Sequence, residues 1–255
     1  FCLRVLRRHL PRHQQRYGYS EGFTICARDE QQEILNGCLD LWLAGPAGAR
    51  EKEELKQRGE QARAVTVRSL AKAIEQLKTA AANSAVDDRL TFVANHYRAC
   101  MQRSNMLDFS DLLLLAIRLF EEVDGVAESY RSQFSAVFID EFQDTTVLQL
   151  HLVRLLGCAR VTVVGDDDQS IYSFRGAQPE IFVTLREMIA PLAVREVVLS
   201  TNYRSTNVIL EACAAVVGHN KQRRAKQVQG QNHGGARGTL VQVCNCRTIE
   251  CEAAY

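Results

Sequence analysis

Residues 136–166, AVFIDEFQDTTVLQLHLVRLLGCARVTVVGD, contain two short apolar runs on either side of a helical segment. We expect strands at 136–139 and 161–164 and a helix at 147–156. Continuous apolar strands that alternate with helices are typical of a parallel sheet covered on both faces. A third strand is expected at 196–199. The stretch predicts an α/β fold, in which functional residues follow the carboxyl ends of the strands.

The chain before this stretch is expected to be mostly helical. Leucines recur at helical spacing over residues 3–10, and Pro11 marks the end of that helix or a kink. Residues 29–103 are rich in Gln, Glu, Ala, Leu and Lys, with interruptions at 45–48 and 83–84. Such a segment resembles a helical insert between two halves of a larger domain.

The character of the sequence changes after residue 107. Asp108 and Asp111 flank Phe109 and Ser110, and carboxylates accept hydrogen bonds from the free N–H groups of a helix start. We therefore expect residues 108–111 to cap a helix over 112–122.

Composition sets broad limits on the class of protein. The 255 residues are 46% hydrophobic and 24% charged, with a formal net charge of +1, and none of the apolar runs is long enough to span a membrane. Nine cysteines are irregularly spaced, without a Cys-x-x-Cys pair or a complete metal-ligand set. We expect free thiols in a reducing compartment, and hence an intracellular protein.

Two segments are locally basic although the whole chain is not. Residues 1–20 carry five arginines, and residues 221–240 carry five basic side chains, with no acidic residue in either segment. Such patches can follow a phosphate backbone. Each patch alone is equally compatible with a solvated helix face or a surface loop.

The first chemical motif, Asp-Glu-Phe-Gln-Asp-Thr, occupies residues 140–145 directly after an expected strand. Asp140 can hold Mg²⁺ against nucleotide phosphates. Glu141 beside it can orient and deprotonate an attacking water. Taken alone, an acidic pair in this place is also the ordinary polar end of a strand.

The second motif spans residues 164–177, VGDDDQSIYSFRGA, where the next expected strand ends. Gln169 is placed to hydrogen-bond a terminal phosphate or the attacking water. Tyr172 and Phe174 offer flat faces for unpaired bases, and Arg175 suits a backbone phosphate. The alternative is a polar loop with two core aromatic residues.

The third motif, Leu-Ser-Thr-Asn-Tyr-Arg-Ser-Thr at residues 199–206, precedes an apolar helix. Tyr203 can stack on an adenine ring, and Arg204 can reach a γ-phosphate. The alternative is that Ser205 or Thr206 simply caps the helix that follows.

Together the three motifs resemble those of the UvrD/Rep type of superfamily 1 DNA helicase. In that family DEFQDT is the Walker-B motif, GDDDQSIYSFRGA couples ATP to single-stranded DNA, and NYRST opens the second motor domain. Residues 107–112, LDFSDL, resemble the point where a helical insert rejoins the first motor domain. The first residues and their arginines resemble the end of a DNA-contacting motif. The resemblance covers nearly the whole chain.

The resemblance implies an ATP- and Mg²⁺-dependent motor acting on single-stranded and duplex DNA, with RecA-like motor domains and 3′ to 5′ movement. It implies a DNA-contacting end of the first motor segment at 1–20, a helical insert at 21–106, the first RecA-like domain at 107–200 and the start of the second at 201–255. By the same resemblance, the roles are Mg²⁺ binding by Asp140, water activation by Glu141, γ-phosphate sensing by Gln169, base stacking by Tyr172 and Phe174, coupling of DNA to the nucleotide site by Arg175, adenine stacking by Tyr203, and γ-phosphate contact by Arg204.

The chain also departs from the family pattern. Phe174 stands where many relatives have Trp, which leaves a smaller stacking face. No Gly-x-x-x-x-Gly-Lys-Ser/Thr phosphate loop occurs, and residues 45–50, GPAGAR, lack the lysine and the hydroxyl. We expect an internal piece of a longer protein, with the phosphate loop before Phe1. We expect this piece to bind ATP weakly and to unwind no DNA by itself.

Two other interpretations remain at this point. A helicase–nuclease subunit of the RecB/AddA type shares the acidic motif, but such relatives usually have GDPKQAIY where this chain has GDDDQSIY. A truncated, non-catalytic product would instead bind single-stranded DNA or a protein partner through Tyr172, Phe174 and the basic patches. We expect a monomer without a membrane partner.

Overall fold

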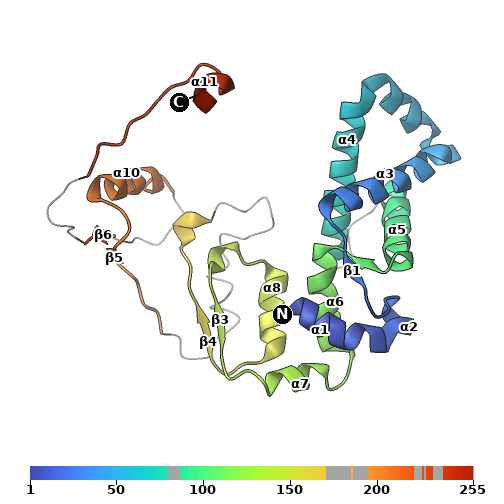
Figure 1. Ribbon diagram of the computed structural model, residues 1–255, viewed down its shortest axis with the longest axis horizontal. Coiled ribbons are helices and arrows are strands. Elements are labelled where there is room, and N and C mark those ends of the chain that lie inside the picture. The colour runs from blue at the N-terminus through green and yellow to red at the C-terminus, as the bar shows by residue number, and fades with distance from the viewer. Residues whose placement is uncertain are drawn as a thin grey trace. The chain divides into compact units, whose positions relative to one another are not determined.

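The computed structural model describes residues 1–79, 87–170, 185, 195–220, 226, 228–231 and 238–254 (Figure 1). Within them the chain is an α-rich α/β protein with three pairs of short parallel strands. The helices are α1 (Cys2–His9), α2 (Gln14–Tyr17), α3 (Arg28–Ala44), α4 (Ala49–Thr79), α5 (Asp88–Arg103), α6 (Phe109–Glu122), α7 (Val126–Arg131), α8 (Val147–Leu156), α10 (Asn207–Val217) and α11 (Ile249–Ala254). The strands are β1 (Thr24–Ile25), β2 (Met106–Leu107), β3 (Val137–Ile139), β4 (Val161–Val163), β5 (Thr201–Asn202) and β6 (Gln229–Gly230).

The chain divides into two compact units. One comprises Phe1–Ile139 with Thr146–Val163, and the other comprises Asp140–Thr145 with Val164–Tyr255. None of the helices in the described part of the chain is long and apolar enough to cross a membrane. All nine cysteines carry free thiols.

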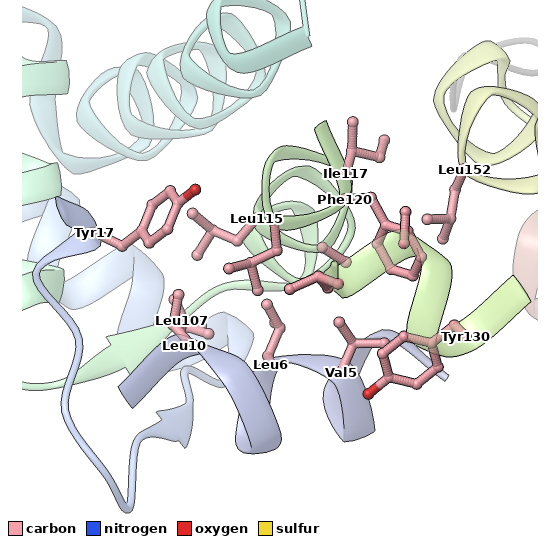
Figure 2. Packing of buried hydrophobic residues seen from close by; sticks show 14 of the residues in the cluster. Val5, Leu6, Leu10, Tyr17, Leu107, Leu115, Ile117, Phe120, Tyr130 and Leu152 are labelled. Atoms are coloured by element: carbon pink, nitrogen blue, oxygen red, sulfur yellow. The ribbon is translucent and has the colours of Figure 1, made fainter. Parts of the chain in front are cut away.

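The first unit has two hydrophobic cores, and the first lies among α1, α6, α7 and α8 (Figure 2). Val5, Leu6 and Leu10 recur at intervals that place them on one helical face, and all three are fully buried. They pack toward α6, which contributes Leu115 and Phe120 to the same cluster. The predicted N-terminal helix is confirmed, and it ends at His9 before a 3-10 turn that contains Pro11.

The second core lies among α3, α4 and α5 (Figure 1). Leu39 and Tyr97 are fully buried in it. The predicted interruption at 45–48 is confirmed, because α3 ends at Ala44 and a 3-10 turn precedes α4. The interruption expected at 83–84 lies outside the described residues. Gly59 makes a further break within α4, where its φ of 78° is a conformation that glycine adopts readily.

Helix α6 begins at Phe109, earlier than the predicted 112. Asp108 is itself the N-cap residue and accepts a hydrogen bond from the Asp111 N–H at 2.9 Å, while Asp111 accepts one from the Asp108 N–H at 3.4 Å. The two carboxylates thus form the predicted cap, but the helix starts directly after the first of them. The ammonium group of Lys78 in α4 lies 2.6 Å from an Asp108 oxygen and 2.7 Å from an Asp111 oxygen. This ion pair joins α4 to the start of α6.

Strands β3 and β4 are parallel, with Val137 opposite Val161 and Ile139 opposite Val163. The predicted strands and the predicted parallel pairing are therefore confirmed. Helix α8 between them has the predicted bounds, and its C-cap residue Gly157 adopts a left-handed conformation. The prediction that both faces of this sheet are covered is wrong for the described residues, because Phe138 is 78% exposed.

The third predicted strand, at 196–199, does not form. Residues 195–200 have no regular secondary structure, and Val197, Val198 and Leu199 are exposed. Strand pairing begins only at Thr201, where β5 runs parallel to β6. An apolar run becomes a strand when it pairs with a neighbouring backbone, and the three strand pairs of the described residues do not include 196–199.

Candidate functional site

The candidate site lies in the second unit, where two polar loops follow β3 and β4. Glu141 has φ and ψ angles of 50° and 44°, so it is left-handed although it is not a glycine. Such a conformation costs about 1–2 kcal/mol for a residue with a β-carbon. Strained backbone of this kind concentrates at functional sites when surrounding contacts hold it. The Glu141 N–H donates to the Asp140 carboxylate at 2.9 Å, and its C=O accepts from the Asp144 N–H at 2.9 Å.

Gln143 connects the two loops through its side chain. Its Nε2 group donates to Glu141 Oε2 at 2.7 Å, and its Oε1 atom accepts from the Asp166 N–H at 3.0 Å. A hydrogen bond to a charged group contributes about 1.5–3 kcal/mol, which is comparable to the strain at Glu141. A main-chain bond from the Phe142 N–H to the Val164 C=O, at 2.9 Å, runs beside this bridge.

The second loop is organised around Asp166. Its carboxylate accepts hydrogen bonds from the Asp168 N–H and from Gln169 Nε2, both at 3.0 Å. The ammonium group of Lys226 contacts the carboxylates of Asp166 and Asp167 and lies 3.5 Å from that of Asp168. A positive charge is needed here, because three adjacent carboxylates repel one another.

The charges of this cluster shift the affinity of its groups for protons. Burial works to raise the pKa of the Asp166 carboxyl, but the hydrogen bonds from Lys226 and Gln169 outweigh burial and hold that pKa below its ordinary value. Burial works to lower the pKa of the Lys226 ammonium, but Asp166 and Asp167 hold that pKa above its ordinary value. The ion pair therefore persists at neutral pH and weakens in acid, once Asp166 takes up a proton.

Two carboxylates of the first loop fit a divalent cation. Asp140 is exposed, and the structure uses one of its oxygens to accept from Glu141, which leaves the second for another ligand. The Oδ1 atom of Asp144 is buried and has no hydrogen-bond partner among the described residues. Mg²⁺ typically binds one or two protein carboxylates together with water and substrate phosphates. The donor set suits such an ion.

The third motif forms a turn between β5 and α10. The side-chain oxygen of Asn202 accepts from the Arg204 N–H at 2.9 Å and from the Ser205 N–H at 2.8 Å. These bonds fix the backbone while the side chains of Tyr203 and Arg204 stay exposed. Thr206 occupies the N-cap position of α10, but its side chain makes no capping hydrogen bond. The turn presents both predicted nucleotide contacts outward.

The structure brings only some of the predicted site residues together. Glu141 and Gln169 belong to one hydrogen-bonded chain that runs through Gln143 and Asp166. Tyr203 and Arg204 belong to the same unit. No hydrogen bond among the described residues joins either of them to this series of hydrogen bonds. Asp140 belongs to the same loop as Glu141, whereas three predicted site residues lie outside the described residues: Tyr172, Phe174 and Arg175.

Sequence reasoning missed Gln143 and Lys226. The available signal was the position of Gln143 inside the acidic motif, next to the apolar Phe142. A polar side chain that becomes buried at such a position needs a hydrogen-bond partner, because burying it without one is costly. Lys226 belongs to the basic segment 221–240, but nothing in the sequence indicated that it pairs with Asp166, 60 positions earlier. Only folding brings Lys226 and Asp166 together.

A second candidate surface lies in the first unit. A pocket of about 460 Å³ opens between α3, α4 and the start of α6. Its lining includes Arg28, Arg68 and Lys72, which are exposed, and Phe109, which is 71% exposed. An exposed aromatic ring beside several cations is the combination that binds single-stranded nucleic acid. In the sequence, Phe109 belongs to the stretch 108–111 that is expected to cap a helix, and nothing there indicates a role in binding.

Comparison with known proteins identifies the family. The family model described as UvrD/REP helicase N-terminal domain matches residues 1–190. The chain is 31% identical to the ATP-dependent DNA helicase PcrA of Staphylococcus epidermidis over 261 aligned residues, which cover 100% of this chain and 33% of that protein. It is 32% identical to the PcrA helicase of Staphylococcus aureus, with 92% of this chain and 30% of that protein covered. It is 34% identical to a probable DNA helicase II homologue of Mycoplasma capricolum, with 66% and 23% covered.

These matches extend along the chain, but the chain spans only about a third of the length of the first two relatives. The family model begins at residue 1 and includes both the Glu141 loop and the Asp166 loop. The chain belongs to the UvrD/REP helicase family, and most of it corresponds to the N-terminal domain of that family.

Proposed function

We propose that the chain is part of an ATP-driven DNA helicase or translocase. The observation that carries the proposal is the hydrogen-bonded chain from Glu141 through Gln143 and Asp166 to Gln169. It ties a carboxylate suited to activate water to a glutamine suited to sense a terminal phosphate. Family membership supports the same reading, since the relatives are named as ATP-dependent DNA helicases.

In the proposed reaction, Glu141 accepts a proton from the water that attacks the γ-phosphate. Its carboxylate is exposed, and the contact from Gln143 holds it in one orientation. Asp140, together with Asp144, would hold Mg²⁺, which neutralises charge on the phosphate oxygens when bound. Gln169 hydrogen-bonds the terminal phosphate or the attacking water.

The exposed turn after β5 supplies the proposed base and phosphate contacts. Tyr203 stacks on the adenine ring, and Arg204 contributes a positive charge to the γ-phosphate. Because Asn202 fixes the backbone of the turn, both side chains keep their outward direction without a bound nucleotide.

DNA contacts are proposed on both units. In the first unit, the exposed Arg4, Arg7 and Arg8 of α1 and the pocket beside Phe109 offer phosphate and base contacts. In the second unit, the proposed contacts are Tyr172, Phe174 and Arg175.

The domain organisation follows from the same proposal. Residues 1–20 and 107–200 would belong to the first RecA-like motor domain, 21–106 to a helical insert, and 201–255 to the start of the second RecA-like domain. The two cores of the first unit support the separation of the helical insert from the first motor domain. The first core contains residues before 24 and after 106, and the second core contains residues between 26 and 106.

The test is DNA-dependent activity in a full-length protein that carries this chain together with a phosphate loop. We expect ATP hydrolysis that single-stranded DNA stimulates, and displacement of a strand from a duplex with a 3′ single-stranded tail in preference to one with a 5′ tail. A protein that neither hydrolyses ATP faster with DNA nor separates either duplex would contradict the proposal. A preference for the 5′ tail would contradict only the direction of movement.

The 255-residue chain alone is expected to bind ATP weakly. Its sequence contains no phosphate loop, whose backbone N–H groups and lysine hold the nucleotide phosphates. Titration of the chain with a fluorescent ATP analogue should give no saturation in the micromolar range. Saturable micromolar binding would show that Tyr203, Arg204 and the acidic loops suffice for binding.

A further inference from the structure

We propose that Gln143 is a positioning residue whose carboxamide couples the Glu141 carboxylate to the Asp166–Gln169 loop. The geometric part of this inference stands on the structure alone, and its catalytic consequence rests on the function proposed above. Gln143 links the two loops so that a displacement of the second changes the orientation of the carboxylate in the first.

The direction of both hydrogen bonds is fixed by chemistry. A carboxylate only accepts, so the group facing Glu141 is the Nε2 donor, at 2.7 Å. A backbone N–H only donates, so the group facing Asp166 is the Oε1 acceptor, at 3.0 Å. The carboxamide therefore has one orientation that satisfies both neighbours, and a flipped amide would satisfy neither.

Burial makes this bridge difficult to replace by solvent. Gln143 is only 2% exposed, although Glu141 is exposed. An unpaired buried amide is strongly unfavourable, so the side chain cannot leave either partner without a new one. If the Asp166 backbone moves, the Gln143 carboxamide must therefore move with it. Otherwise its hydrogen bond to Asp166 or its hydrogen bond to Glu141 is lost.

The backbone around Gln143 keeps the bridge short. The Phe142 N–H donates to the Val164 C=O at 2.9 Å, and the fully buried Phe142 ring anchors the same turn. This main-chain bond joins the beginnings of the two loops, but it does not reach the Glu141 carboxylate. In the described part of the chain, only the Gln143 side chain contacts both that carboxylate and the Asp166 backbone.

The second loop is itself one rigid turn, which makes it a suitable partner for such a link. Asp166 also accepts from the Gln169 side chain at 3.0 Å, and the Lys226 ammonium contacts its carboxylate. A displacement of the Asp166 backbone that accompanies movement of the proposed phosphate sensor Gln169 would therefore reach Glu141 through Gln143.

Two variants separate the two bonds of Gln143. Gln143→Leu has a similar size and removes both hydrogen bonds. Gln143→Glu keeps an acceptor for the Asp166 N–H but places a negative charge against Glu141. The matched control is Gln133→Leu, because Gln133 is exposed after α7 and its side chain donates to the Ser129 C=O within the same turn.

The first measurement uses the 255-residue chain and needs no activity. Hydrogen exchange of the Asp166 amide should be slow in the unchanged chain and in Gln143→Glu, and markedly faster in Gln143→Leu. Equal exchange rates in the unchanged chain and in Gln143→Leu would overturn the bridge. Circular dichroism of each variant confirms that the comparison is made between folded chains.

The second measurement uses the full-length protein. Both variants should lower kcat for ATP hydrolysis by about 10- to 100-fold, as loss of an orienting contact behind a catalytic group commonly does, with KM for ATP little changed. Adding Gln143→Leu to Glu141→Gln should cause no further loss, because Gln143 acts through Glu141. An unchanged kcat in both variants, or a further loss in the double variant, would overturn the coupling. If the unchanged full-length protein hydrolyses no ATP, the proposed function fails, while the exchange measurement still decides whether the bridge exists.

Discussion

Replacing Glu141 by Gln in a full-length protein with a phosphate loop is expected to abolish nearly all DNA-stimulated ATP hydrolysis and to leave a small residual rate. An amide cannot take a proton from water, and loss of a general base commonly lowers kcat by about 10²- to 10⁴-fold. The geometry of the site should survive, because the amide oxygen of the new side chain can still accept from Gln143 Nε2. The backbone strain at this position is unchanged by the substitution.

The measurements are the steady-state rate of ATP hydrolysis with single-stranded DNA and the affinity for a fluorescent oligonucleotide. DNA affinity should remain nearly intact, because Glu141 is not part of a proposed DNA contact. Glu128→Gln is the matched control, since Glu128 is an exposed carboxylate paired with Arg131 on α7. Unchanged hydrolysis in Glu141→Gln would rule out Glu141 as the base.

Replacing Lys78 by Met is expected to lower the free energy of unfolding of the first unit by about 3–5 kcal/mol. Lys78 is only 14% exposed and neutralises Asp108 and Asp111, whose side chains are 5% and 15% exposed. Met fills the same volume but leaves two buried carboxylates without a cation. Because whole domains are stable by about 5–15 kcal/mol, this loss is large.

The single tryptophan of the chain, Trp42, provides the measurement, because it lies in α3 and packs against Phe92 beside the second core. Urea unfolding followed by Trp42 fluorescence should show a lower midpoint for Lys78→Met. Lys72→Met is the matched control, since Lys72 is exposed on the same helix and should change the midpoint little. A midpoint equal to that of the unchanged chain would contradict the role of the buried ion pair.

The same ion pair predicts how the loss of stability in Lys78→Met depends on pH. Burial works to raise the pKa of the Asp108 carboxyl, but Lys78 and the hydrogen bonds from Asp111 and Tyr97 hold that pKa below its ordinary value. In the unchanged chain, its stabilising contribution is complete above the unfolded pKa of about 3.9 and is lost as the pH falls through the folded pKa. In Lys78→Met, protonation removes the unpaired charge. The difference between the two proteins should therefore shrink as the pH is lowered from neutral toward that range.

Local sequence signals were sufficient for many elements of the fold. Thr146 and Gly157 bound α8 through a cap and a left-handed residue, and such signals act within a few positions. The apolar runs of β3 and β4 likewise predicted a parallel pair. The run at 196–199 failed as a strand because a strand also needs a neighbouring backbone, which its own residues do not provide.

The sequence by itself determined the acidic loop that contains Asp140 and Glu141, the family and the order of its motifs, because these depend on residue types at fixed spacing along the chain. Only the tertiary structure decided that Glu141 is left-handed, that Gln143 binds Glu141 and Asp166 together, and that Lys226 neutralises the second loop. The physical reason is distance along the chain. A hydrogen bond or ion pair between residues that are 23 or 60 positions apart depends on where folding places them.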